Sequence, residues 1–191
     1  MKKLNLGCGW NKLSGWINVD YVPKRFGCEY MDVTEEFPYD TESIDYIYSE
    51  HLIEHIEFSE GIHMLSECYR VLKPGGKVRI STPDLKFLVK LYTDNKTDLQ
   101  KGYVEYSVEQ YRLEGKTDTF VINNFVRGWG HTFIYDEKTL RDSLESVRFS
   151  NIRKYSLGKS HTDVFKNLDN IKRLPEGHLE LETFTLEGKK C

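Results

Sequence analysis

The chain has 191 residues, 39% of them hydrophobic, which suffices for one sizeable core but not for two full-size domains. Its 30 acidic and 27 basic side chains are mixed along the length and give a net charge of −3, so a nucleic-acid partner is not implied. The first apolar run is too short for a signal peptide, and no later run could cross a bilayer. We therefore predict a single domain, residues 1–191, in the cytoplasm and without a membrane partner. The sequence does not indicate an oligomeric state.

Short strand-like runs alternate with turn-like or helix-like stretches, and this alternation predicts an α/β fold with a mostly parallel sheet. In the last predicted strand the apolar residues change phase between Leu181 and Phe184, which indicates a bulge or a strong twist. The predicted strands are Lys3 to Leu6, Trp16 to Asp20, Cys28 to Val33, Ile44 to Tyr48, Lys77 to Thr82, Ile152 to Leu157 and Leu179 to Leu186.

Two helices are predicted from apolar residues at helical spacing. The first runs from Ser59 and must stop within Leu72-Lys73-Pro74-Gly75-Gly76, because proline and paired glycines cannot continue a helix. Asp136 can cap the second helix, whose apolar positions extend to Val147.

A long segment, Pro83 to Thr132, separates the fifth predicted strand from the Asp136 helix. It is longer than a connection needs, and its aromatic content favours an ordered cover over a disordered loop. We predict that this insertion covers a substrate. Its aromatic residues include Tyr92, Tyr103, Tyr106, Tyr111, Phe120, Phe125 and Trp129.

The four cysteines, Cys8, Cys28, Cys68 and Cys191, lie far apart and form no CxxC pair. This spacing indicates neither a disulfide framework nor a cysteine-based zinc site. No metal is predicted for the protein.

The first strand ends directly in Gly7-Cys8-Gly9, a turn that lets the backbone approach a ligand closely. Asp20 and Asp32 end the next two predicted strands, at the carboxyl edge where open α/β sheets bind ligands, and such a carboxylate can accept bonds from ribose hydroxyls. A dinucleotide site would want a third glycine where Lys12 stands. The spacing from Gly7 to Asp20 also leaves room for only a turn or two, so NAD or FAD is a poorer ligand.

Together these motifs resemble the class I methyltransferase family, in particular its type 11 and UbiE-like branches. The resemblance covers roughly residues 1–84, with a further similar element from Gly130 to Phe149. The matching runs are Leu4-Asn5-Leu6-Gly7-Cys8-Gly9, Val19-Asp20, Met31-Asp32-Val33, Tyr48-Ser49-Glu50-His51-Leu52-Ile53-Glu54-His55 and Leu72-Lys73-Pro74-Gly75-Gly76.

The resemblance implies a Rossmann-like, doubly wound sheet of seven strands, the last antiparallel, with a shortened first crossover helix and a helical, aromatic insertion after strand five. It also implies S-adenosylmethionine as the cofactor. Asn5 stands where many members carry an acid, which leaves open how the cofactor's ammonium is held. The cofactor-binding residues that it implies are Asn5, Gly7, Cys8, Gly9, Asp20, Tyr21, Asp32, Val33, Ser49 and Glu50.

Two histidines are the candidate catalytic residues. His51 follows the acid expected nearest the transferred methyl group, and His131 could act as a general base from the insertion. The run from His51 to His55 also matches H-x-x-E-H, the inverted zinc-peptidase signature, but here it follows a strand instead of lying within a helix.

We therefore predict an S-adenosylmethionine-dependent methyltransferase that acts on an O- or N-nucleophile of a small-molecule or glycan-like acceptor. One alternative is a module that binds the cofactor or a partner without catalysis. A lesser alternative is a zinc metallopeptidase that uses the H-x-x-E-H residues.

Overall fold

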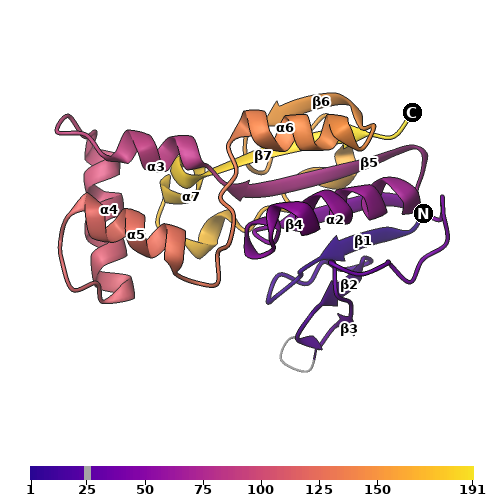
Figure 1. The fold of residues 1–191 in the computed structure, drawn as a ribbon, viewed down its shortest axis with the longest axis horizontal. Coiled ribbons are helices and arrows are strands. Elements are labelled where there is room, and N and C mark those ends of the chain that lie inside the picture. Colours follow the sequence, from indigo (N-terminus) through magenta and orange to yellow (C-terminus); the bar gives the residue numbers. More distant parts are fainter. Residues whose placement is uncertain (24–26) are drawn as a thin grey trace.

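The computed structural model describes residues 1–23 and 27–191. A seven-stranded sheet with the order β3-β2-β1-β4-β5-β7-β6 forms its centre (Figure 1). Strand β7 runs antiparallel to both neighbours, and the pairings among β1 to β5 are parallel, which confirms the predicted Rossmann-like fold class. The strands are β1 Lys3–Leu6, β2 Ile17–Asp20, β3 Glu29–Tyr30, β4 Ile44–Glu50, β5 Leu72–Pro83, β6 Ser150–Tyr155 and β7 Thr183–Lys189.

One face of the sheet is covered by α2 (Phe58–Val71) and α6 (Glu137–Ser146), which lie side by side in Figure 1. Both helices bury apolar residues against the strands in one large core. Asp136 caps α6 as predicted, its side chain accepting a hydrogen bond from the Thr139 backbone N–H at 2.7 Å. These two helices and the strands fix the positions of the strand ends where ligands bind in such folds.

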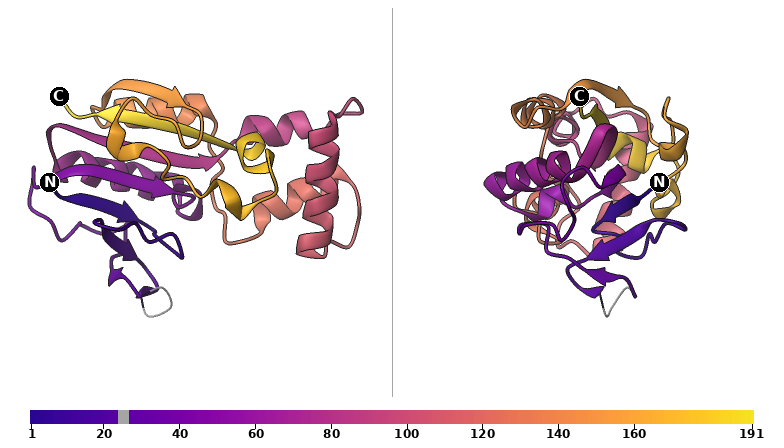
Figure 2. Two further views of the ribbon diagram at one scale, coloured as in Figure 1. Left: turned by 180° about the vertical axis from the view of Figure 1, so that it is seen from behind. Right: turned by 90° about the vertical axis from the view of Figure 1, so that its right-hand side faces the viewer.

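The opposite face is crossed by the segment 156–177, which Figure 2 shows running over the strands on its way to the last helix. The segment contains two short 3-10 helices, η2 (Asp163–Phe165) and η3 (Ile171–Arg173). Phe165 is fully buried and packs its ring on Trp16 and Tyr46, with centroids 6.5 and 5.6 Å away. The shortened first crossover helix that the resemblance implies is absent, because residues 7–16 form only turns between the first two strands.

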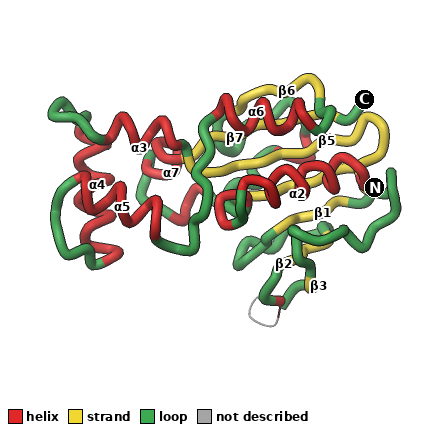
Figure 3. Tube along the Cα trace, viewed as in Figure 1, coloured by secondary structure: helices red, strands yellow, loops and turns green. Residues whose placement is uncertain are grey.

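The insertion after β5 folds as three helices, α3 (Leu85–Leu91), α4 (Asp98–Tyr111) and α5 (Asp118–Arg127). With the short α7 (His178–Glu182) they gather beyond the carboxyl edge of the sheet, as Figure 3 shows in red. They have a small apolar core of their own, which includes Phe87, Leu91, Tyr103 and Phe125. The predicted helical insertion is thus present and stands at the edge where the site is expected.

Three predicted elements differ from the structure. The third strand is only Glu29–Tyr30, because the chain leaves the sheet once the Met31 N–H has bonded the Asp20 carbonyl at 3.1 Å. Strand β5 begins at Leu72, so the run through Pro74 belongs to the sheet. Its pairing with β4 shifts register between Ile44 and Tyr46. The predicted strand 179–186 is instead the helix α7 followed by β7, so its change of phase marks a boundary between elements and not a bulge.

Among the described residues, no helix combines the length and the apolar character that a membrane span requires.

Candidate functional site

The glycine turn after β1 is held by the carboxylate at the end of β2. Gly7 and Gly9 both adopt positive φ, +59° and +46°. The Gly9 N–H donates to Asp20 Oδ2 at 3.0 Å, and the Val22 N–H donates to Asp20 Oδ1 at 2.9 Å. Each carboxylate oxygen can accept a second bond, so Asp20 can fix the turn and still bind a ligand hydroxyl.

Above this turn lies a cavity of about 250 Å³, which we call the turn cavity. Glu50, at the end of β4, lines this cavity and joins two other lining residues: Oε2 accepts from the Asn11 side-chain amide and Oε1 from the Asn170 backbone N–H, both at 2.9 Å. The lining residues are Asn5, Gly7, Cys8, Gly9, Trp10, Asn11, Tyr48, Glu50, His51, Asn170 and Arg173.

Two further residues of the predicted set, Asn5 and Cys8, also line this cavity. The buried Asn5 amide donates to the Asn11 carbonyl at 3.0 Å and to Asn18 Oδ1 at 2.9 Å, which ties the connection after the turn to β2. Burial, together with the neighbouring Cys28 and Asp20, raises the pKa of the Cys8 thiol to about 12. The thiol is therefore neutral near pH 7 and is a poor nucleophile.

The remaining predicted residues, Tyr21, Asp32, Val33 and Ser49, are not among those that line the turn cavity. Asp32 accepts two bonds from Thr34, at 2.9 Å from its N–H and 2.7 Å from its hydroxyl. Val33 is buried in the main core, so only its backbone is left for a ligand, whereas Tyr21 is exposed. Ser49 is buried below the surface, and its hydroxyl has no hydrogen-bond partner within the described part of the chain.

A second cavity, of about 280 Å³, opens between the strand ends and the helices of the insertion. We call it the histidine cavity, because it brings His51 and His131 together from distant parts of the sequence. His51 and Arg173 line both this cavity and the turn cavity, so the two meet at these side chains. The lining residues are His51, Glu54, His55, Pro83, Tyr111, Phe125, Trp129, His131, Arg173, Leu174 and Glu182.

His51 has a defined tautomer in this arrangement. Its Nε2 lies 2.5 Å from an Arg173 guanidinium nitrogen and 3.0 Å from the Thr183 hydroxyl. Because a guanidinium only donates, Nε2 must be the accepting nitrogen and Nδ1 carries the proton. Nδ1 lies 3.2 Å from Glu54 Oε1, a close polar contact outside hydrogen-bond geometry, which places the imidazole beside the buried carboxylate with its basic nitrogen towards the junction of the cavities.

Burial and neighbouring charges set the ionisation of this cavity. Burial raises the pKa of Glu54, but His51 and His55 lower it by more, so the net shift is downward and the carboxylate stays charged. At Glu182 burial has the larger effect and raises the pKa, although the Tyr103 hydroxyl donates to the carboxylate at 2.5 Å and His51 and Arg173 also lower its pKa. Burial lowers the pKa of His131, which keeps this imidazole neutral near pH 7.

Sequence reasoning missed the contribution of the segment 156–177. Asn170 and Arg173 reach the cavities because Asp169 is buried beneath them, where it pairs with Arg79 at 2.5 Å. That pairing joins residues 90 positions apart, so no local pattern in the sequence indicates it. Glu182 was also not predicted as a site residue, because its segment has the sequence pattern of a strand but forms α7.

Known proteins resemble the chain in both sequence and fold. Residues 4–80 match the family described as "Methyltransferase domain". A methyltransferase from Archaeoglobus fulgidus has TM-score 0.61 and 17% identity, covering 99% of this chain and 86% of that one. One from Mesorhizobium loti has TM-score 0.60 and 15% identity, covering 99% and 90%. A Thermotoga maritima protein, described as a possible histamine N-methyltransferase, has TM-score 0.58 and 14% identity, covering 100% and 82%.

No curated protein matches the sequence. The sheet order with its antiparallel β7 and the glycine turn define the Rossmann-like methyltransferase class. The family match over residues 4–80 and the fold shared with known methyltransferases agree with the resemblance that the motifs predict.

The turn cavity fits the cofactor of this class. A Cβ placed on Gly9 would meet nothing within 4 Å, so the backbone at this point faces open space in which a ligand can lie. Asp20 stands beside it as a charged acceptor for hydroxyl groups. The H-x-x-E-H residues, by contrast, do not form the helix of a zinc peptidase. His51 has φ +50° at the end of β4, and His55 lies on the three-residue 3-10 helix η1 (Ile53–His55).

Proposed function

We propose that the protein transfers the methyl group of S-adenosylmethionine to an O–H or N–H group of a small-molecule or glycan-like acceptor. The observation that carries this proposal is that the turn cavity and the histidine cavity meet at His51 and Arg173. Methyl transfer from a sulfonium is an in-line displacement, so donor and acceptor must be held on either side of one point.

The cofactor, when bound, supplies an electrophilic methyl group. The residues of this chain that would hold it are the Gly7–Gly9 turn, Asp20 and Glu50, with Asp32 and Tyr21 farther along the sheet edge and Asn5, Cys8, Val33 and Ser49 around them. The acceptor would occupy the histidine cavity, where the lining rings of Tyr111, Phe125 and Trp129 would exclude water from the bound acceptor.

His51 and His131 are the proposed catalytic residues. The position of His51 beside Glu54 leaves a basic Nε2 that can receive the acceptor's proton once Arg173 has moved away from it. His131 is the second candidate, since it lines the same cavity and is neutral.

Calorimetric titration with S-adenosylmethionine and S-adenosylhomocysteine tests the cofactor site. Transfer of a labelled methyl group to a fractionated metabolite extract, compared between the wild type and His51→Ala, tests catalysis. Tight binding without transfer to any fraction would favour the non-catalytic module, and absence of binding would overturn the proposal.

A further inference from the structure

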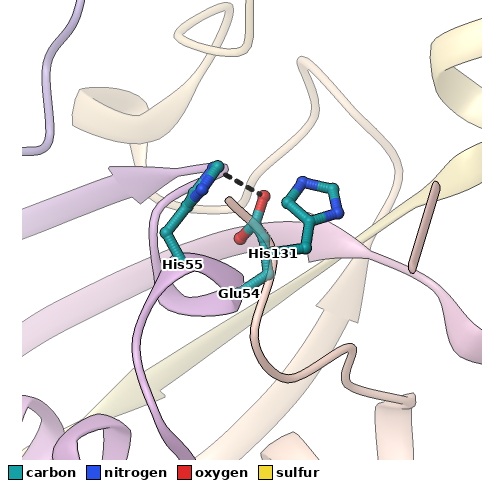
Figure 4. A group of neighbouring side chains, drawn as sticks. All are labelled: Glu54, His55 and His131. Carbon is teal, nitrogen blue, oxygen red and sulfur yellow. Dashed lines mark ion pairs between the residues drawn. The ribbon is translucent and has the colours of Figure 1, made fainter. Parts of the chain in front are cut away.

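Within the histidine cavity, Glu54, His55 and His131 bring one potential metal-ligating atom each to within 4.8 Å of one another (Figure 4). The three side chains come from two distant segments, η1 and the loop that follows α5. The Thr132 N–H joins these segments by donating to the Glu54 carbonyl at 2.8 Å, and the rings of His55 and His131 have their centroids 4.9 Å apart. The cluster is therefore fixed by backbone pairing.

Within the described part of the chain, only one oxygen of the Glu54 carboxylate has a hydrogen-bond partner. It is fully buried, and Oε2 accepts from the Thr82 hydroxyl at 3.1 Å. Oε1 lies 3.2 Å from His51 Nδ1 and 3.9 Å from His55 Nε2, yet neither contact has hydrogen-bond geometry. A buried carboxylate oxygen without a donor is costly, and a cation beside it would remove that cost.

His131 is held in the tautomer that a metal ligand needs. Its Nδ1 lies 2.7 Å from the Phe125 carbonyl oxygen, and because a carbonyl only accepts, Nδ1 must carry the proton. The unprotonated Nε2 is the nitrogen on the side of Glu54 and His55 in Figure 4. A ring nitrogen that donates to a backbone carbonyl is the usual support for a histidine that binds metal through its other nitrogen.

We propose that Glu54, His55 and His131 form a binding site for one first-row divalent cation, for which Zn²⁺ is the best match to two imidazoles and one carboxylate. Bonds of about 2 Å require the three atoms to close in slightly on the ion. Sequence reasoning predicts no metal here, and the H-x-x-E-H pattern pairs the wrong histidines, because Nε2 of His51 is already engaged by Arg173 and Thr183.

Three protein ligands leave a coordination position open towards the cavity, which is the arrangement of catalytic zinc sites. The role of this open position rests on the proposed function: it would take the acceptor's hydroxyl oxygen. The coordinated O–H would give its proton to Nε2 of His51 once Arg173 has moved away from it, and the oxygen lone pair would form the O–CH₃ bond as the S–CH₃ bond breaks. The sulfur keeps that electron pair and leaves as S-adenosylhomocysteine. In this role His131 holds the ion, and His51 receives the proton.

The test uses full-length protein without a polyhistidine tag, freed of metal by chelation. Calorimetry with Zn²⁺ and visible absorption with Co²⁺ should each show one ion per chain. His55→Ala, His131→Ala and the near-isosteric Glu54→Gln should each weaken Zn²⁺ binding by more than about 10-fold, a loss that second-shell changes alone can produce. His63→Ala, at an exposed position of α2, is the matched control and should bind as the wild type does.

S-adenosylmethionine affinity is measured on the same samples to separate the two proposals. Substoichiometric Zn²⁺ in the wild type, or wild-type Zn²⁺ affinity in all three variants, overturns the metal site even where cofactor binding is intact. Stoichiometric Zn²⁺ that the variants lose supports the site, even where the cofactor fails to bind and the proposed function falls.

Discussion

The Gly9 backbone N–H donates to Asp20 Oδ2 at 3.0 Å and so joins the turn after β1 to the end of β2. One carboxylate thereby has a structural and a proposed ligand-binding role. The two roles respond differently to substitution, because an amide keeps an acceptor oxygen for Gly9 while it loses the charge.

We expect Asp20→Ala to weaken S-adenosylmethionine binding by about 1 to 3 kcal/mol, because the ligand's hydroxyls lose a charged acceptor. Asp20→Asn should fall between Ala and the wild type. Calorimetric titration measures the affinities, with Asp40→Ala at an exposed position as the control. Wild-type affinity in both Asp20 variants would remove this residue from the site.

The two turn glycines should respond differently to alanine. At Gly7 a Cβ would lie 2.7 Å from Leu52 Cδ1, so Gly7→Ala adds a clash to the cost of a left-handed residue, about 1 to 2 kcal/mol. At Gly9 only the conformational cost applies, because the space around its Cβ is open.

Thermal unfolding should therefore show Gly7→Ala as the less stable variant, while Gly9→Ala stays folded and loses cofactor affinity. The comparison separates the effect of the glycine turn on cofactor binding from its effect on stability. A Gly9→Ala protein that binds S-adenosylmethionine as tightly as the wild type would show that the cofactor does not lie over this turn.

The parts of the fold that sequence predicted correctly depend on local signals. Strand β1 and the cap at Asp136 follow from a short apolar run before a glycine turn and from a capping residue before a helical pattern. The strand predicted from Leu179 was wrong over residues 179–182, because α7 buries His178, Leu179 and Glu182 at helical spacing, a pattern that so few residues cannot separate from a strand.

The candidate site was only partly predictable for a different reason. The glycine turn and the two acids each follow a predicted strand, so a parallel sheet brings them to the same edge. Arg173 enters both cavities through the burial of Asp169 against Arg79, and the Glu54, His55 and His131 cluster depends on how the insertion returns to η1. Such contacts are set by tertiary packing and have no local sequence pattern.

The buried pair between Arg79 and Asp169 should be important for both stability and binding. Asp169 also accepts from the Gly158 N–H at 2.6 Å and from the Ser81 hydroxyl at 2.8 Å, and thus holds the segment 156–177 on the sheet. We expect Asp169→Ala to lower the free energy of unfolding by about 3 kcal/mol, since it leaves a buried charge with fewer partners.

Chemical denaturation checks this value, with Lys138→Ala in an exposed pair on α6 as a control that should leave stability unchanged. Cofactor affinity should fall as well, because Asn170 and Arg173 lose their support. An unchanged denaturation midpoint in Asp169→Ala would show that this pair does not hold the segment.

Acid should weaken the contact between α2 and the connection after β3. The hydrogen bond from Arg70 lowers the pKa of Glu67 from its usual 4.5. Partial burial opposes this shift, and the hydrogen bond from the Phe37 N–H adds to it. A carboxyl whose pKa is depressed on folding stabilises the protein above its unfolded pKa, and this contribution is lost as the pH falls through the folded pKa.

We therefore expect Glu67→Gln to be less stable than the wild type at pH 7, by about 1 to 2 kcal/mol. The gap should close as the pH falls below 4.5. Urea unfolding at several pH values measures both effects, with Glu145→Gln at an exposed position of α6 as the control. A gap that is the same at acid and neutral pH would contradict the linkage.

The proposed role of residues 83–132 as the acceptor's cover depends most on Trp129. This residue has φ +56°, and its ring packs on Tyr111, Phe125 and His131 with centroids 4.7, 5.8 and 5.4 Å away. It is still 46% exposed, so it can contact an acceptor that enters the histidine cavity.

We expect Trp129→Ala to leave S-adenosylmethionine affinity unchanged and to raise the KM for the acceptor by about 10-fold or more, because stacking and water exclusion are lost together. Tyr92→Ala, which removes an exposed aromatic ring elsewhere in the same insertion, is the matched control. Limited proteolysis gives a second readout, since cofactor and product analogue should slow cleavage within 83–132 if the insertion closes over them. If the ligands do not slow cleavage and Trp129→Ala keeps wild-type turnover, these aromatic residues only complete the small core of the insertion.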